Sequence, residues 1–384
     1  MGFYNILPEL LLLVADNLSL GDLINFRSTC SWVKKVLTSP FQKLCLQDVG
    51  TLTALQWAAV RGHAKLIELA ISNGAAIDLP FSGDLRLPTL GVRGNVFQKY
   101  FMHPCELAHK DLYSKNNKST FLTPLFHAAC YSHVKAIKVL LDHGARTKYF
   151  DGIMTPAHAA ATQGNVLCMQ PFVRPGFDIN FRGAYQTTIL HHATLGGKAM
   201  LKYILELDGG TSLVNAKTRS GLTPLHCLRT RAGNLDCQRS QVELLLQYGA
   251  DIYARDNDGN TPAHSFAYWG DTECLQALID AGFDLHTRGK CGKTILHCAM
   301  IRRKETLTYL LGLEKGRDII DIEDDHQLTV LDYASTHPFH LRVAEILLRH
   351  NARRKSSDAM PLVLNTECCD SSYPAGGFIL GEAW

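Results

Sequence analysis

Along most of the chain, short apolar segments alternate with polar turns at a regular period. A four-residue motif recurs: a Thr, then a Pro or a small or aliphatic residue, then a mostly apolar residue, then often a His. Its threonines are Thr123, Thr155, Thr188, Thr223, Thr261, Thr294 and Thr329. Successive threonines lie 32, 33, 35, 38, 33 and 35 residues apart, and a further unit begins upstream at Thr53. Such a period is typical of proteins built from stacked structural repeats.

Each unit predicts two short antiparallel helices. The Thr hydroxyl can cap the first helix, and a Pro at the first helical position loses no hydrogen bond there. A second apolar segment follows and usually stops at Gly-Ala or Gly-Phe, as at Gly249-Ala250 and Gly282-Phe283. A Gly in the left-handed conformation can close such a helix.

These residues resemble the ankyrin repeat, whose signature is T-P-L-H-x-A over about 33 residues. The resemblance covers roughly residues 50 to 353. It implies an all-α fold, an ankyrin-repeat solenoid of about eight helix-pair repeats with short β-turn fingers. Three departures predict irregular units: Pro171 and Pro175 in the third unit, extra residues from Arg231 to Gln241 in the fifth, and Asn351 in place of the last closing Gly. Asn can still adopt the left-handed conformation that closes a helix.

Histidines occupy the same slot of five units, at His158, His191, His226, His264 and His297. We expect one per stacked layer, about 10 Å apart, which is too far to share one metal ion. A structural role follows, with each imidazole bonding near its Thr or a neighbouring turn. The twelve cysteines contain no C-x-x-C and are expected to be packed thiols.

The first fifty residues do not follow the repeat. They contain Leu7-Pro8-Glu9-Leu10 with Leu11, then Asp22-Leu23, then Thr29-Cys30-Ser31-Trp32-Val33. This stretch resembles an F-box, although Trp32 stands one position before the family's usual tryptophan or leucine. The resemblance implies that a Skp-type adaptor, linked to a cullin scaffold, packs on these helices. The adaptor-binding residues it implies are Leu7, Pro8, Leu10, Leu11, Leu23 and Cys30.

An alternative remains open, in which residues 5 to 46 form a helical cap that covers the end of the solenoid. The order of the two segments resembles the F-box and ankyrin-repeat proteins of filamentous fungi. We therefore expect an F-box at 1–48, repeats at 50–355 with an insertion at 79–117, and a disordered tail at 356–384.

Target recognition is expected on the turn tips between repeats and on the insertion. The insertion is as consistent with a passive excursion as with a binding loop. The candidate target-binding residues are Phe97, Tyr100, Phe101, Tyr149, Asp151, Arg219, Asp256, Asp258 and Lys290.

Composition narrows the partners. Apolar residues make up 46% of the chain and charged residues 20%, and the formal net charge is +3. This balance argues against nucleic-acid or membrane partners. The longest strongly apolar run, Leu10 to Ala15, is too short to span a bilayer, and acidic residues interrupt a possible secretory signal. We expect an intracellular protein, in the cytoplasm, the nucleus or both.

No P-loop, G-x-S-x-G or H-E-x-x-H motif is present. We expect no enzyme activity, catalytic residue, cofactor or metal. The leading hypothesis is a substrate receptor of an SCF-type ubiquitin ligase, whose repeats hold an unknown target protein. The alternative is an ankyrin scaffold or regulatory binding protein with no role in ubiquitination.

Overall fold

A computed structural model describes residues 48–49, 52–72, 74–78, 123–148, 154–228, 236–300, 304–336 and 341–353. The chain divides into two compact units, which are described separately: unit 1 comprises residues 1–101 and 111–177, and unit 2 comprises residues 102–110 and 178–384. Several predictions fall outside the described residues: the six adaptor-binding residues, the insertion at 79–117 with Phe97, Tyr100 and Phe101, the tips Tyr149 and Asp151, and the tail.

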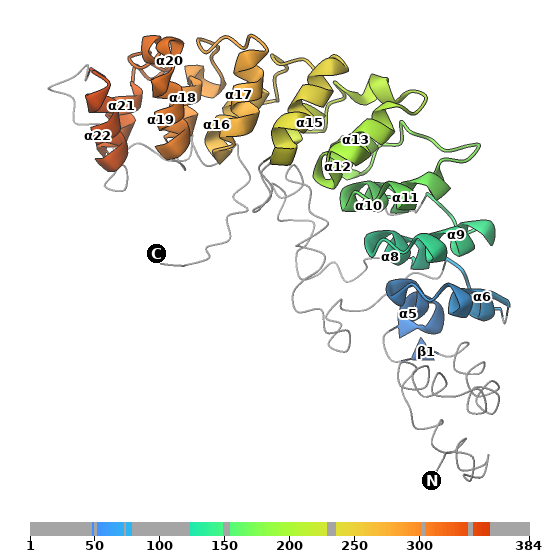
Figure 1. The fold of residues 1–384 in the computed structure, drawn as a ribbon. Coiled ribbons are helices and arrows are strands. Elements are labelled where there is room, and N and C mark those ends of the chain that lie inside the picture. The colour runs from blue at the N-terminus through green and yellow to red at the C-terminus, as the bar shows by residue number, and fades with distance from the viewer. Residues whose placement is uncertain are drawn as a thin grey trace. The chain divides into compact units, whose positions relative to one another are not determined.

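Unit 1 stacks its helices in two layers (Figure 1). The first helices of successive pairs pack against one another, α5 on α8 and α8 on α10, and the second helices do the same, α6 on α9. The elements are β1 (Asp48–Val49), β2 (Leu52–Thr53), α5 (Ala54–Arg61), α6 (Ala64–Ser72), α8 (Pro124–Cys130), α9 (Val134–Asp142), α10 (Pro156–Gln163), α11 (Val166–Met169) and the 3-10 turn η4 (Gln170–Phe172).

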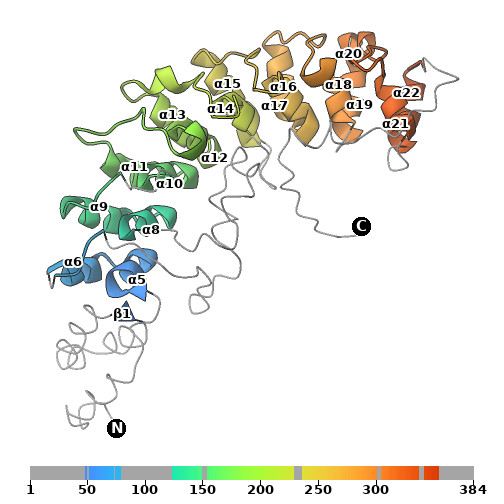
Figure 2. The ribbon, with the colours of Figure 1, turned by 180° about the vertical axis from the view of Figure 1, so that it is seen from behind.

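Unit 2 repeats the arrangement (Figure 2). The helices α12, α14, α16 and α18 pack in sequence in one layer, and α13, α15, α17 and α19 pack in sequence in the other. The elements are η5 (Ala184–Gln186), α12 (Ile189–Gly196), α13 (Lys198–Leu205), η6 (Gly210–Leu213), α14 (Pro224–Cys227), α15 (Asp236–Gln247), α16 (Pro262–Trp269), α17 (Thr272–Asp280), η7 (Lys290–Gly292), α18 (Ile295–Ala299), α19 (Lys304–Gly312), α20 (Glu314–Asp318), α21 (Val330–Thr336) and α22 (Leu341–Arg349).

The predicted caps are present. Thr123 Oγ1 accepts a hydrogen bond from the backbone N–H of Phe126 at 3.2 Å, and Pro124 occupies the first helical position. In unit 2 the same slot becomes a capping box, in which the side chain at the third helical position also accepts from the N–H of the Thr. Thr329 forms the box with Asp332, so the motif tolerates a carboxylate in place of the imidazole.

The helix ends are also as predicted. Gly282, which follows α17, has φ +91°, and a Cβ there would meet no atom within 4 Å, so its backbone conformation alone favours Gly. Asn351 closes α22 with φ +65°, which confirms that an Asn adopts the left-handed conformation in the last unit.

Three features depart from a regular array. The second helix of the third unit shrinks to α11 and the turn η4 at Pro171, as the prolines predicted. The sequence did not indicate the antiparallel pair β1–β2, with Asp48 opposite Thr53, or the extra helix α20. Residues 229–235 of the long fifth unit lie outside the described part. The exact repeat number stays a prediction.

Candidate functional site

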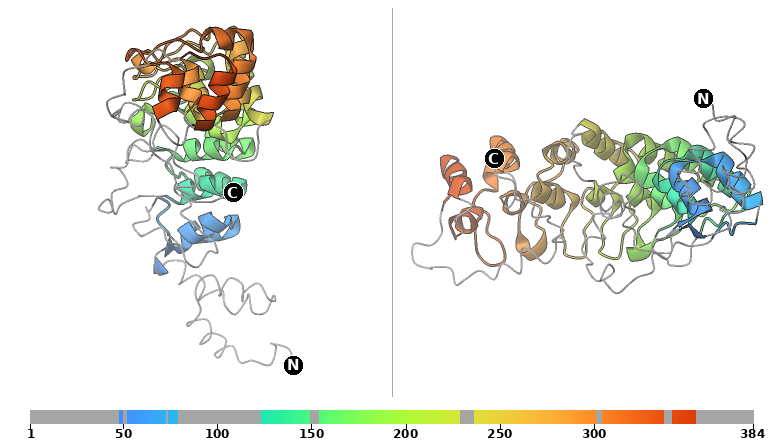
Figure 3. Two further views of the ribbon diagram at one scale, coloured as in Figure 1. Left: turned by 90° about the vertical axis from the view of Figure 1, so that its left-hand side faces the viewer. Right: turned by 90° about the horizontal axis from the view of Figure 1, so that it is seen from below.

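The turns that join the helix pairs of unit 2 form the candidate site. In each turn the N–H of the first residue donates to the carbonyl oxygen of the fifth at 2.8 to 3.0 Å. We call these turns fingers, and together the finger row; in Figure 3 the turns of unit 2 extend to one side of the helices. The fingers are residues 183–187, 218–222, 256–260, 289–293 and 324–328.

Neighbouring fingers are joined by backbone hydrogen bonds at three junctions, and at the fourth the N–H of Lys290 donates to Oδ1 of Asn260 at 3.0 Å. The N–H of Arg219 donates to the carbonyl of Tyr185 at 2.6 Å, and the N–H of Asp325 donates to that of Cys291 at 3.0 Å. Between them, the N–H of Asn257 donates to the carbonyl of Ser220 at 3.0 Å. A ladder of this kind satisfies main-chain groups and fixes the spacing of the tips, which gives a partner a preorganised surface.

The recurring histidines tie each helix pair to the next finger. Thr261 N–H donates to Nδ1 of His264 at 3.4 Å, while Nε2 of His264 donates to the carbonyl of Lys293 at 3.2 Å. The other members of this histidine row bond in the same way, with acceptors Leu222 for His191, Asn260 for His226 and Leu328 for His297. The predicted bonding near the local Thr or a neighbouring turn is confirmed: these four histidines make both bonds, and in unit 1 Nδ1 of His158 lies 2.7 Å from Oγ1 of Thr155.

This geometry requires neutral imidazoles, because a proton on Nδ1 would oppose the Thr N–H that it accepts. Burial lowers the pKa of His226, His264 and His297 to about 4, aided by nearby Lys217, Arg255 and Arg288 respectively. Within unit 1, burial lowers the pKa of His127 and His158 to about 4. These rings act as structural hydrogen-bonding groups near neutral pH.

Four predicted tip residues lie in the finger row. Arg219 is exposed, and Asp258 forms an ion pair with Lys290 of the next finger at 3.0 Å. Asp256 instead turns into its own finger, where Oδ1 accepts from the N–H groups of Asp258 and Asn260. Burial raises the pKa of Asp256 to about 6. The role of these residues in target binding stays a prediction.

Sequence reasoning missed four basic residues at the finger bases, which we call the cation row: Arg182, Lys217, Arg255 and Arg288. All four are exposed, and they are separated by 35, 38 and 33 residues, so their period was readable in the sequence. Arg255 Nη1 donates to the carbonyls of Gly259 at 2.6 Å and of Arg288 at 2.8 Å. Each member thereby bridges to the following repeat.

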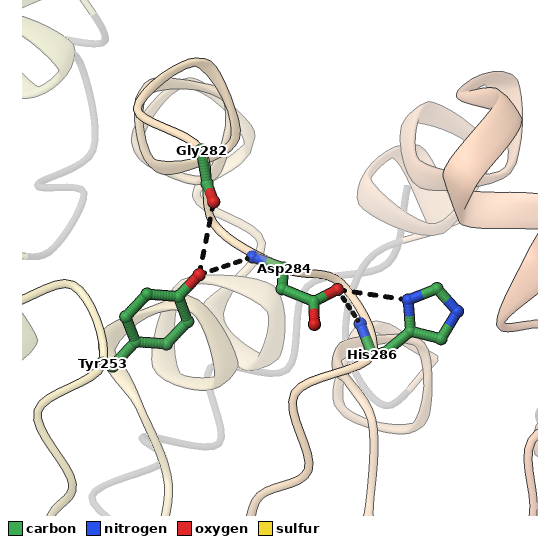
Figure 4. Close-up of polar contacts among 4 residues, drawn as sticks. All are labelled: Tyr253, Gly282, Asp284 and His286. Atoms are coloured by element: carbon green, nitrogen blue, oxygen red, sulfur yellow. Dashed lines mark hydrogen bonds and ion pairs between the residues drawn. The ribbon is translucent and has the colours of Figure 1, made fainter.

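A second set of bridges lies where one repeat closes and the next begins (Figure 4). The hydroxyl of Tyr253 donates to the carbonyl of Gly282 at 3.2 Å and accepts from the N–H of Asp284 at 3.1 Å. Asn215 makes the matching pair one repeat earlier, with Gly249 and Asp251, both at 2.9 Å. A Tyr therefore replaces an amide at this joint, and its ring stacks on Phe283 at 5.3 Å.

Metal ligands, cysteines and membrane-spanning helices can be assessed only in the described residues. There, no group of three or more His, Cys, Asp or Glu side chains is arranged to hold a metal. Among the cysteines whose side chains are described, none is joined in a disulfide, and all are buried except Cys291, which is partly exposed. No helix in these ranges is both long and apolar enough to cross a bilayer.

Comparison with known proteins gives a family match. A model of ankyrin repeats in three copies matches residues 95–183, 157–256, 190–288, 231–322 and 267–358. The human SH3 and multiple ankyrin repeat domains protein 2 is 27% identical over 243 residues, which is 62% of this chain and 13% of that protein. The ankyrin repeat protein nuc-2 of Neurospora crassa is 30% identical over 262 residues, 60% of this chain and 24% of that protein.

The E3 ubiquitin-protein ligase KEG of Arabidopsis thaliana is 26% identical over 245 residues, 53% of this chain and 15% of that protein. Among solved structures, the ankyrin repeat domain of Bcl-3 has 21% identity, with a TM-score of 0.44 over 67% of this chain and 98% of that one. The human ASB11 ankyrin repeat domain has 19% identity and a TM-score of 0.48, over 66% and 95%.

The three curated relatives are matched over at most 24% of their own length. The family model covers well over half of the chain, and the Thr caps from Thr123 onward, the histidine row and the helix pairs from α8 onward lie inside the matched ranges. Repeats of this kind bind protein partners. The chain belongs to the ankyrin-repeat family.

Proposed function

We propose that this chain is a non-catalytic adaptor that presents a bound protein for ubiquitination. Residues 1–48 are the F-box, which recruits a Skp-type adaptor and through it a cullin scaffold. The ankyrin repeats of residues 50–355 hold the target. The chain itself transfers no ubiquitin.

The observation that carries the binding role is the finger row. Its backbone bonds are satisfied within and between fingers, while charged side chains such as Arg219 and Arg255 remain exposed. A rigid, charged surface of this kind loses little entropy on binding and selects partners by charge. The ankyrin family's role in protein binding supports the same reading.

The ubiquitin link rests on the Leu7-Pro8-Glu9-Leu10 and Asp22-Leu23 elements. A Leu-rich segment of about forty residues is too small to bury its own apolar surface and needs a partner. The name of one relative, E3 ubiquitin-protein ligase KEG, is consistent with this proposal.

The test is co-purification of the full chain with a Skp-type adaptor. The double variant Leu7→Ala/Pro8→Ala should lose the adaptor, whereas Leu167→Ala, which truncates a 58% exposed Leu of α11, should retain it. Circular dichroism should show equal helix content in both variants. Retention of the adaptor by the double variant would contradict the F-box proposal. The chain would then be an ankyrin scaffold without a role in ubiquitination.

The insertion at 79–117 is a second proposed target contact, through Phe97, Tyr100 and Phe101. Deletion of residues 82–115 should leave adaptor binding intact and deplete the target from purified complexes. An unchanged set of bound proteins would show that the insertion is a passive loop that does not bind the target.

A further inference from the structure

The cation row has hydrogen-bonding capacity that is not used within the described part of the chain. Arg182, Arg255 and Arg288 each employ a single nitrogen, Nη1, for two backbone carbonyls. For Arg288 these are the carbonyls of Gly292 at 3.4 Å and Glu323 at 2.8 Å. Nη1 carries two N–H groups, so both are consumed, and the Nε and Nη2 donors remain. That remaining edge is one that grips a carboxylate bidentately.

The charges of the row are also unneutralised. In the part of the chain that the structure describes, none of its four members forms an ion pair, whereas Arg239 and Arg349, which lie on helices, do. Arg239 on α15 pairs with Glu243 at 2.9 Å and Asp280 at 2.6 Å. These two helix arginines are therefore neutralised by carboxylates, whereas the cation row at the finger bases meets none among the described residues.

The carbonyl bonds hold these cations in place. Lys217 Nζ donates to the carbonyl of Arg255 at 2.8 Å, and Arg255 in turn donates to that of Arg288. A fixed guanidinium loses little side-chain entropy when it binds an anion. Stacked helices lie about 8–10 Å apart. An extended chain in the polyproline II conformation advances about 3.1 Å per residue with three residues per turn, so a carboxylate at every third position would lie on one face and match the row.

We propose that the cation row of unit 2 binds an extended acidic segment of the partner protein, with an Asp or Glu at about every third position. The proposal rests on the proposed protein-binding function and gives it a chemical specificity. Acidic residues interrupt and end the row, since Asp256 and Asp258 lie in the third finger, and Glu323 occupies the position that follows Arg288 in register. This pattern disfavours a uniformly anionic nucleic acid and favours a peptide of mixed sequence.

The experiment measures fluorescence anisotropy of the full chain with labelled peptides in low salt. The probe contains four Glu-Gly-Ser repeats, and its controls replace every Glu by Gln or place the four Glu side by side. The spaced Glu probe should bind most tightly, and Arg255→Gln/Arg288→Gln should weaken it about tenfold, as expected for two exposed ion pairs. Arg239→Gln, the matched control on the paired surface, should leave the affinity unchanged.

Arg255→Lys separates binding from stability. Lys retains the charge and one carbonyl bond but lacks the bidentate edge, so the affinity should be intermediate while the thermal midpoint stays near wild type. The inference is overturned by absence of probe binding, by equal binding of wild type and the Gln double variant, by equal affinity for spaced and clustered Glu, or by tighter binding of oligo(dT). Adaptor co-purification is measured separately, so failure of this inference leaves the F-box test unaffected.

Discussion

Lowering the pH from 7 to 5 should destabilise unit 2, because buried histidines accept Thr N–H groups only when neutral. The pKa of His226, His264 and His297 is about 4 in the folded chain, against an ordinary value near 6.5. The unfolded chain therefore binds more protons between these values. The contribution of these histidines to stability is complete above pH 6.5 and is lost as the pH falls toward 4.

The expected magnitude follows from the size of these shifts. One pKa unit corresponds to 1.36 kcal/mol, so each histidine removes about 2 kcal/mol of unfolding free energy at pH 5. Asp256 acts in the opposite direction, since its pKa of about 6 lies above its ordinary value and protonation relieves a buried charge. Its protonation returns about 1 kcal/mol, which leaves a net loss of about 5 kcal/mol for the three histidines and Asp256 together.

The assay is urea unfolding of the full chain at pH 7, 6 and 5, followed by far-UV circular dichroism at constant ionic strength. His264→Gln isolates one histidine, because Gln at this position can still complete a capping box with Thr261. The variant should lose about 2 kcal/mol less than wild type between pH 7 and pH 5. The exposed His326→Gln should behave as wild type. Equal pH dependence in wild type and His264→Gln would refute the reasoning.

Three further predictions concern single joints, each measured by urea unfolding. Tyr253→Phe should lower the free energy of unfolding by about 1 kcal/mol, because it removes both hydrogen bonds of the hydroxyl. An unchanged urea midpoint would show that these two bonds do not stabilise the fold. Gly292→Ala should lower the free energy of unfolding by about 2 kcal/mol and Gly282→Ala by about 1 kcal/mol. Both glycines have positive φ, but only at Gly292 would a Cβ meet Asp325, so equal losses would contradict the crowding. Asn351→Ala should cost about 1 kcal/mol, and a gain in stability would be inconsistent with its left-handed backbone.

The sequence predicted the features whose cause is local. Thr123 and Pro124 start a helix through groups within one turn, and Pro171 shortens its helix wherever the neighbours lie. The same holds for Asn351, because only a few residue types adopt positive φ. The bonding of the histidine row to its own Thr was predictable for the same reason.

The remaining features depend on where another repeat places its backbone. Asp256 and Asp258 are two residues apart and looked alike as finger-tip charges, yet one accepts N–H groups inside its turn and the other pairs with Lys290. Tyr253 gave no sign that its hydroxyl would serve the next repeat. The cation row was visible as a period, but its unpaired guanidinium edges depend on the positions of the carbonyls around them.

One affinity purification tests the central claim most directly. The full chain, the Leu7→Ala/Pro8→Ala variant and the Arg255→Gln/Arg288→Gln variant are isolated from proteasome-inhibited cells, and the Skp-type adaptor and cullin are quantified by mass spectrometry. An adaptor function predicts that both proteins accompany the wild-type chain and the second variant in equal amounts and are absent from the first. Absence of the adaptor from the wild-type chain, or equal recovery with all three, would contradict it.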